Sequence, residues 1–136
     1  MWKKLAQTID QVTPGEQQPE SDHFYKGEQS ESGLYGGRHW RHSRAWFSYE
    51  LTDKKREAKT LQITYNGIDA GRHFEIQING VVIAKVESTG NAQDFFSVNY
   101  PIPEELVKKS NGKYIVKFVA RPGSIAGGIY GVRLLR

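Results

Sequence analysis

The sequence predicts an all-β protein, an antiparallel β-sandwich of the jelly-roll or Greek-key type. Three observations indicate this fold. Apolar and polar residues alternate in short runs, as they do in strands with one buried face. Turn-forming pairs such as Asn-Gly separate about seven or eight such runs, at spacings typical of sandwiches. A helical pattern is confined to one short segment near residues 103–109.

The first part of the chain differs from the rest. Residues 1–33 contain the polar stretches TPGEQQPESD and GEQSESG, which lack sustained periodicity. We therefore expect residues 1–33 to be a polar N-terminal segment or linker that packs on the sandwich. Residues 34–136 are expected to form the β-sandwich domain itself.

The strands follow from period-2 alternation. WFSYEL, TLQITY, DFFSVNY and KYIVKFVA place every second residue, aromatic or aliphatic, on one face, and IYGVRLL makes a last strand. HFEIQINGVVIAKV predicts a hairpin, because Asn79-Gly80 suits the positive φ angles of a type I′ turn. The shared core is predicted to contain Ile63, Ile76, Ile78, Val98, Val116 and Phe118.

The segment PIPEELVKKSNGK predicts one or two helical turns. Pro103 suits a first helical position. Glu104 and Glu105 favour the positive N-terminal end of a helix, and Lys108 and Lys109 favour the negative C-terminal end.

Composition excludes several functions. The chain has no cysteine, so a disulfide scaffold, a zinc-thiolate site and a cysteine nucleophile are ruled out. The net charge of +4 is small, and we expect no nucleic-acid partner, because such domains usually carry a stronger basic stripe. No apolar run approaches the roughly 20 residues that span a bilayer, so we expect no membrane partner.

No catalytic residues are predicted, and no cofactor. Glu104 and Glu105 are explained by the helix start, and Ser124 lacks a G-x-S-x-G elbow. The glycines of RPGSIAGGIYG do not follow the dinucleotide fingerprint. We therefore expect that this chain is not an enzyme.

The most unusual segment is GLYGGRHWRHSRAWF, which is rich in Arg, His and Trp and contains no acidic residue. Three interpretations fit it. Aromatic rings and cationic donors could hold a sugar, or they could stack on nucleobases. In the structural interpretation, which we favour, alternate residues face the core and the arginines pair with glutamates of residues 16–31. The candidate residues for a ligand or a domain interface are Tyr35, Arg38, His39, Trp40, Arg41, His42 and Trp46.

His39 and His42 have an H-x-x-H spacing, but we predict no metal site. The segment leads directly into a strand, and positions three apart in an extended chain point to opposite faces.

Four separated motifs, PGEQQPESDH, GRHWRH, WFSYEL and AGGIYGVRLLR, carry a resemblance. Over residues 8–136 the chain resembles the C-terminal tail domain of bacterial glycoside hydrolases related to β-L-arabinofuranosidases. The resemblance implies a galactose-binding-like sandwich, a parent (α/α)₆ barrel and a setting in Bacteroidetes or similar glycan degraders. The cysteine nucleophile and zinc site of such barrels cannot exist in a chain without cysteine.

The resemblance implies a non-catalytic accessory domain that supports the catalytic barrel of its parent. The alternative is a carbohydrate-binding module that docks the parent on a plant or host glycan. The parent is expected to be periplasmic or extracellular, with its signal outside this sequence. The directions of Trp40 and Trp46, into the core or into solvent, should distinguish the two roles.

Overall fold

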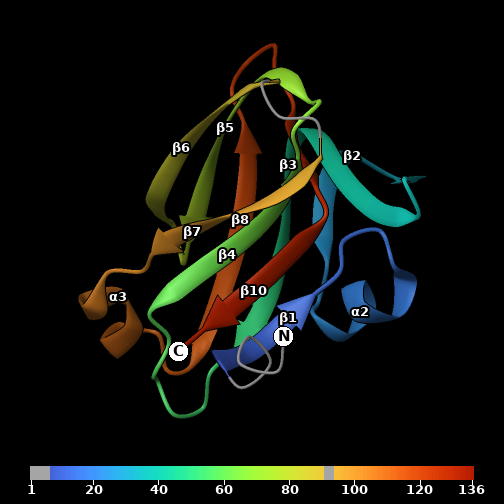
Figure 1. Cartoon of the computed structure of the whole chain (residues 1–136). Coiled ribbons are helices and arrows are strands. Elements are labelled where there is room, and N and C mark those ends of the chain that lie inside the picture. Colours follow the sequence, from blue (N-terminus) through green and yellow to red (C-terminus); the bar gives the residue numbers. More distant parts are fainter. Residues whose placement is uncertain (1–6, 91–93) are drawn as a thin grey trace.

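Two antiparallel β-sheets face each other in the computed structural model, which describes residues 7–90 and 94–136 (Figure 1). The four-stranded sheet has the order β1 (Thr8–Val12), β10 (Gly131–Leu135), β4 (Thr60–Asn66) and β7 (Phe95–Pro101). The six-stranded sheet contains β2 (Lys26–Tyr35), β3 (Arg38–Thr52), β8 (Lys113–Ala120), β5 (Ala70–Ile78) and β6 (Val81–Thr89), with β9 (Ala126–Ile129) paired to β3. The described residues also include the short helices α2 (Gln17–Asp22) and α3 (Glu104–Lys109). The predicted all-β sandwich is confirmed.

The core lies between the sheets, as the alternation predicts. Its largest fully buried side chains include the alternate β3 residues Phe47, Tyr49 and Leu51. Of the six predicted core residues, five are completely buried, and Val98 is partly buried and packs against them. The strand register inferred from the sequence is therefore correct at these positions.

The predicted hairpin joins β5 to β6. Asn79 and Gly80 both have positive φ angles, 51° and 83°, which is the requirement of a type I′ turn. The Asn79 side chain also accepts a hydrogen bond from the backbone N–H of Ile115 (2.8 Å) and donates one to the carbonyl of Lys113 (3.1 Å). The turn is thus fastened to the beginning of β8.

The helical pattern near residues 103–109 is confirmed by α3, for which Pro103 is the N-cap residue. The helix buries Leu106 and Val107 in the core cluster and lies beside the end of β7 (Figure 1). Its lysines form loose i,i+4 ion pairs with Glu104 and Glu105 at 3.9 and 3.8 Å.

The N-terminal part of the chain differs from the expectation. Thr8–Val12 pairs with β10, and β2 pairs with β3, so strands of both sheets begin before residue 34. The boundary expected at residue 34 falls inside β2. The polar sequence KGEQSESGLY lacks alternation because this edge strand is largely exposed.

No helix within residues 7–90 and 94–136 is long and apolar enough to cross a membrane.

Replacement of a central core residue tests this packing. Ile76 is 0% exposed, so Ile76→Ala should lower the free energy of unfolding by about 2–5 kcal/mol in urea titrations. Val81, on the neighbouring strand, is 49% exposed, and Val81→Ala should change the same quantity by no more than about 1 kcal/mol. Equal losses in the two variants would contradict the packing described.

Candidate functional site

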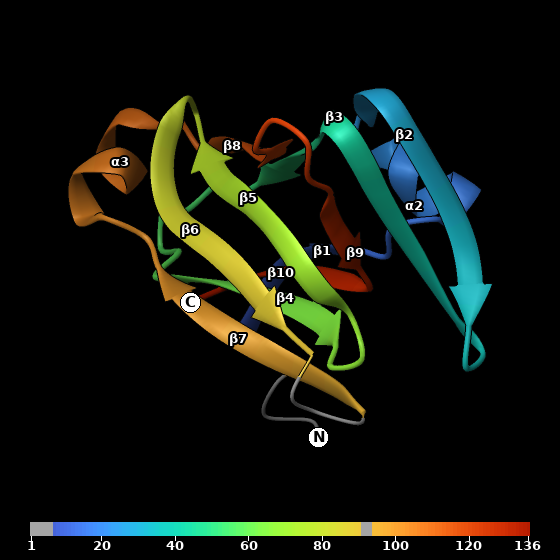
Figure 2. The same ribbon diagram turned by 90° about the horizontal axis from the view of Figure 1, so that it is seen from above.

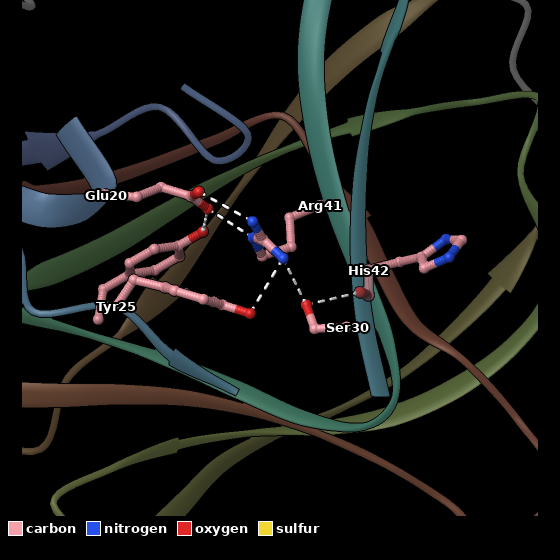
Figure 3. Close-up of polar contacts among 6 residues, drawn as sticks. Glu20, Tyr25, Ser30, Arg41 and His42 are labelled. Carbon is pink, nitrogen blue, oxygen red and sulfur yellow. Dashed lines mark hydrogen bonds and ion pairs between the residues drawn. The ribbon is translucent and has the colours of Figure 1, made fainter. Parts of the chain in front are cut away.

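The residues of the Arg/His/Trp segment divide between two sides of β3. Alternation sends Trp40, His42 and Trp46 to one side and Arg41 to the other. Figure 3 shows the His42 ring pointing away from the Arg41 guanidinium, which lies next to Glu20. The segment is therefore not a single binding surface.

Arg41 is used inside the protein. Its guanidinium donates two hydrogen bonds to the Glu20 carboxylate of α2, at 2.6 and 2.9 Å, and further bonds to Tyr25 (3.0 Å) and Ser30 (2.8 Å). The Tyr49 hydroxyl donates to the same carboxylate at 2.6 Å. The side chains of Arg41 and Glu20 are only 11% and 8% exposed. This is the pairing with a glutamate of residues 16–31 that the structural interpretation predicts.

The environment of Glu20 keeps it ionised. Burial alone raises the pKa of this carboxyl, but the hydrogen bonds from Arg41, the Gly15 backbone and Tyr49 outweigh it, and the pKa lies below its usual value. Burial together with the Glu20 charge raises the pKa of Tyr49 far above its usual value, so that hydroxyl remains a donor.

A second contact fastens the segment after α2 to β1. The His23 ring donates from Nδ1 to the carbonyl of Pro19 (2.7 Å) and from Nε2 to the Asp10 carboxylate (2.8 Å). Because both partners are acceptors, the two hydrogen bonds form together when both ring nitrogens carry protons, that is, in the imidazolium. The hydrogen bond to Asp10 accordingly raises the pKa of His23 above its usual 6.5, although burial opposes this.

The two tryptophans take an intermediate position, half-buried and outside the core cluster. The Trp40 indole lies directly over Gly33 on β2, where a Cβ atom would clash with it, and its centroid is 4.7 Å from the His42 ring. The ammonium of Lys117 lies 4.5 Å above the Trp46 ring. Each ring is thus partly covered by neighbours of the same sheet, and neither ring lies in the core.

His39 and His42 lie on opposite sides of β3. Among the residues that the structure describes, no group of three or more His, Asp or Glu side chains could hold a metal ion.

The tip of the β2–β3 hairpin forms a wall with Phe95 of β7 and Tyr130, which lies between β9 and β10. The chain turns at Gly36 and Gly37, whose φ angles are positive, and the Arg38 guanidinium lies over the Phe95 ring at 4.4 Å. The Phe95 ring in turn makes an edge contact with Tyr130, with centroids 4.9 Å apart. Arg38 was among the predicted residues, whereas Phe95 and Tyr130 were not.

This wall closes one end of a groove of about 650 Å³ on the outer face of the four-stranded sheet. We call it the sheet groove. Its floor is made by outward-facing polar residues of neighbouring strands, and its sides include His39, the loop after β1 and the Arg38–Phe95 wall. The floor residues are Gln11, Gln62, Thr64, Ser97 and Arg133.

The floor is held in place by hydrogen bonds between side chains. Gln62 Nε2 donates to the Asn99 amide oxygen at 3.0 Å, and the hydroxyls of Thr64 and Ser97 are 2.9 Å apart. Gln62 faces Arg133 across the β4–β10 pairing, and Arg133 faces Gln11 across the next. Gln62 and Thr64 are the polar residues of the alternating sequence TLQITY. The alternation predicts the buried residues of this strand, and its polar residues could have indicated the groove floor.

A family model described as "Family of unknown function (DUF6805)" matches residues 4–135. The chain belongs to this family. The match runs across residue 34, in agreement with the continuous sheets. No curated protein matches the chain in sequence.

Solved structures share the fold at low sequence identity. A family 35 carbohydrate-binding module from an environmental isolate superposes with a TM-score of 0.68 and 18% identity, covering 94% of this chain and 93% of that one. The family 35 module from Clostridium thermocellum gives 0.60 and 13%, with 93% and 98% covered. The Podospora anserina GH26-CBM35 β-(1,4)-mannanase gives 0.56 and 13%, with 93% of this chain and 27% of that chain covered. The likeness is thus to carbohydrate-binding modules, one of them part of a glycoside hydrolase, while the relation to β-L-arabinofuranosidases stays a prediction.

The buried ion pair makes a first prediction for this region. Arg41→Ala leaves the Glu20 carboxylate buried without its partner, which typically costs about 3–5 kcal/mol of unfolding free energy. The double variant Glu20→Gln/Arg41→Met should lose less than Arg41→Ala, because no charge then remains buried. Arg44→Ala, an exposed control on the same strand, should change the value by less than about 0.5 kcal/mol. An Arg41→Ala loss equal to that of Arg44→Ala would show that the pair does not anchor α2.

The imidazolium predicts a pH dependence of stability. The folded pKa of His23 lies above its usual 6.5, so its stabilisation is complete below that pH and is lost as pH rises through the folded value. The pKa values of Asp10 and Glu20 are lowered, so their stabilisation is present above the usual carboxyl values and lost in acid. The difference in unfolding free energy between wild type and His23→Gln should therefore be largest between about pH 5 and 6.5 and shrink toward pH 9. A difference that does not vary with pH would contradict the assignment.

Proposed function

We propose that the chain is a non-catalytic carbohydrate-binding module and that the sheet groove is its binding site. The main support is the groove itself, which is open, has a floor of hydrogen-bonding side chains and is bounded by the Arg38–Phe95 wall. The likeness in fold to carbohydrate-binding modules supports the proposal.

The groove matches the chemistry of a sugar. Sugar hydroxyls both donate and accept, and the floor offers amide and hydroxyl groups that do both, together with Arg133 as a donor. The guanidinium of Arg38 covers Phe95, so the planar guanidinium is the surface on which a sugar ring packs at the wall. We expect dissociation constants in the range of about micromolar to millimolar, because a small polar ligand makes few contacts in an open site.

The same groove is poorly suited to hydrolysis. Most glycoside hydrolases use two carboxyl groups on either side of the scissile bond. Glu16 is the one acidic residue among those that line the groove within the described part of the chain. The proposed role is therefore accessory, and the parent would be an exported glycoside hydrolase whose catalytic barrel is a separate domain.

A second candidate function is structural support of that barrel. The β2–β3 hairpin projects beyond the body of the sandwich (Figure 2), and Leu34 and Tyr35 at its tip are 62% and 50% exposed. Exposed apolar residues on a projecting hairpin favour a contact with another domain. Arg41 is not available for this contact, since it is paired with Glu20.

A matched pair of variants tests the groove. The 136-residue chain is screened against plant and host polysaccharides on a glycan array, and the best ligand is titrated by calorimetry. Gln62→Ala and Arg38→Ala should each weaken binding by about tenfold or more, which corresponds to about 1.4 kcal/mol. Gln77→Ala is the control, because Gln77 faces outward on the other sheet and its loss should leave binding unchanged.

The outcomes separate the candidate functions. Absence of binding to every glycan, or equal effects of Gln62→Ala and Gln77→Ala, would overturn the proposed site. Leu34→Ser should leave glycan binding unchanged and weaken only the contact with a neighbouring domain, if the hairpin tip makes one.

A further inference from the structure

A second cavity lies at the opposite edge of the molecule from α2. β6 ends the six-stranded sheet and β7 ends the four-stranded sheet, and the two edge strands run beside each other (Figure 2). Between them is a cleft of about 400 Å³ that reaches into the space between the sheets. We call it the edge cleft. Phe96 lines both cavities, but the floor of the sheet groove lies on the outer face of the four-stranded sheet, whereas the edge cleft opens between the two sheets.

Part of the edge-cleft wall is aromatic and is formed by Tyr65, Phe74, Phe96 and Tyr100. Tyr65 lies 5.6 Å from Phe96 and 6.4 Å from Phe74 between ring centroids, in tilted geometries. Val86 and Val98 add aliphatic surface to the wall. Phe96 is an exposed large aromatic residue and the two valines are only partly buried, so on this side the core is open to a ligand.

The polar residues that line the cleft include two tyrosines whose hydroxyls are joined to each other. Tyr65 and Tyr100 join their hydroxyl oxygens by a hydrogen bond of 2.7 Å. Because one proton serves the pair, the second hydroxyl proton and free lone pairs are left for a third hydroxyl. Burial raises the pKa of both tyrosines, so both remain neutral donors.

Size and charge limit the ligand. A cavity of about 150 Å³ holds one benzene ring, so about 400 Å³ is enough for a molecule of two fused rings. The charged residues that border the cleft, Asp69, Lys85 and Glu87, include both signs. Asp69 is engaged by Arg72 (3.5 Å) and Glu87 by His73 (3.1 Å). Both carboxylates are thus already paired, which favours an uncharged ligand.

We propose that the edge cleft binds an uncharged planar phenol of one or two rings. The aromatic wall holds the ring faces, and the hydroxyl of the ligand extends the Tyr65–Tyr100 hydrogen bond. This site is independent of the proposed sugar site and persists if that proposal fails.

Three probes of similar size separate the contribution of the ligand hydroxyl from that of the planar rings. 2-Naphthol has the planar rings and the hydroxyl, naphthalene lacks the hydroxyl, and decahydro-2-naphthol lacks the planarity. 2-Naphthol should bind with a dissociation constant of about 10–500 μM, the range of a small ligand with few polar contacts, measured by its fluorescence. The other two should bind at least about tenfold more weakly, the loss expected for one hydrogen bond or for the aromatic contacts.

Two variants of the cleft and one of the groove complete the test. Tyr100→Phe should reduce the affinity for 2-naphthol to that for naphthalene, and Val98→Trp should fill the cleft and abolish binding. Arg38→Ala, at the sheet groove, should leave the affinity for 2-naphthol unchanged. Methyl chemical shifts of Val86 and Val98 in the wild type, which depend on no variant, should move with 2-naphthol. Unmoved methyl shifts, or equal affinity for the three probes, would overturn the proposal.

Discussion

The buried contact between Glu20 and Arg41 is the interaction on which the arrangement of the N-terminal third depends. It connects α2, a polar helix of six residues with little intrinsic stability, to the middle of β3. The loop before α2 forms one side of the sheet groove, and its Gly15 packs so closely on the Trp40 carbonyl that a Cβ atom would lie 2.7 Å away. The ion pair therefore holds a groove wall as well as a helix.

The Glu20–Arg41 pair fixes the position of α2 on β3 and adds little to the net free energy of unfolding. Removing two charges from water costs about as much as their attraction returns, so a buried pair contributes little net stability but strongly penalises the loss of one partner. Here the carboxylate also accepts from Tyr49, and the guanidinium also donates to Tyr25 and Ser30. One arrangement of α2 on β3 satisfies all these groups together, and the imidazolium of His23 fixes the following turn to Asp10 in the same way.

The buried residues of the strands could be predicted from the sequence wherever one face of a strand is apolar and the other is polar. The alternation in TLQITY and HFEIQI predicts which residues are buried because period-2 burial is a local property of a strand. It missed β2, since both faces of that exposed edge strand are polar. It also missed the contact of Arg38 with Phe95 and that of Phe95 with Tyr130, because these residues are brought together by sheet topology across a long sequence separation. The sequence marks Arg38 as unusual, but only the position of β7 beside the hairpin shows that Arg38 contacts Phe95.

The two cavities use the two faces of the same strands. On β4, Gln62 and Thr64 point into the sheet groove, while Tyr65 lines the edge cleft. On β7, Ser97 lies at the groove, and Val98 and Tyr100 line the cleft. A slip of β7 by one residue against β4 would turn β7 over, so that Ser97 and Asn99 would face the cleft, and Val98 and Tyr100 would face the groove. The Gln62–Asn99 and Thr64–Ser97 hydrogen bonds on one face and the Tyr65–Tyr100 hydrogen bond on the other all require the observed register. Hydrophobic burial stabilises the two strands, and the hydrogen bonds between polar side chains fix their register. The same register creates both cavities.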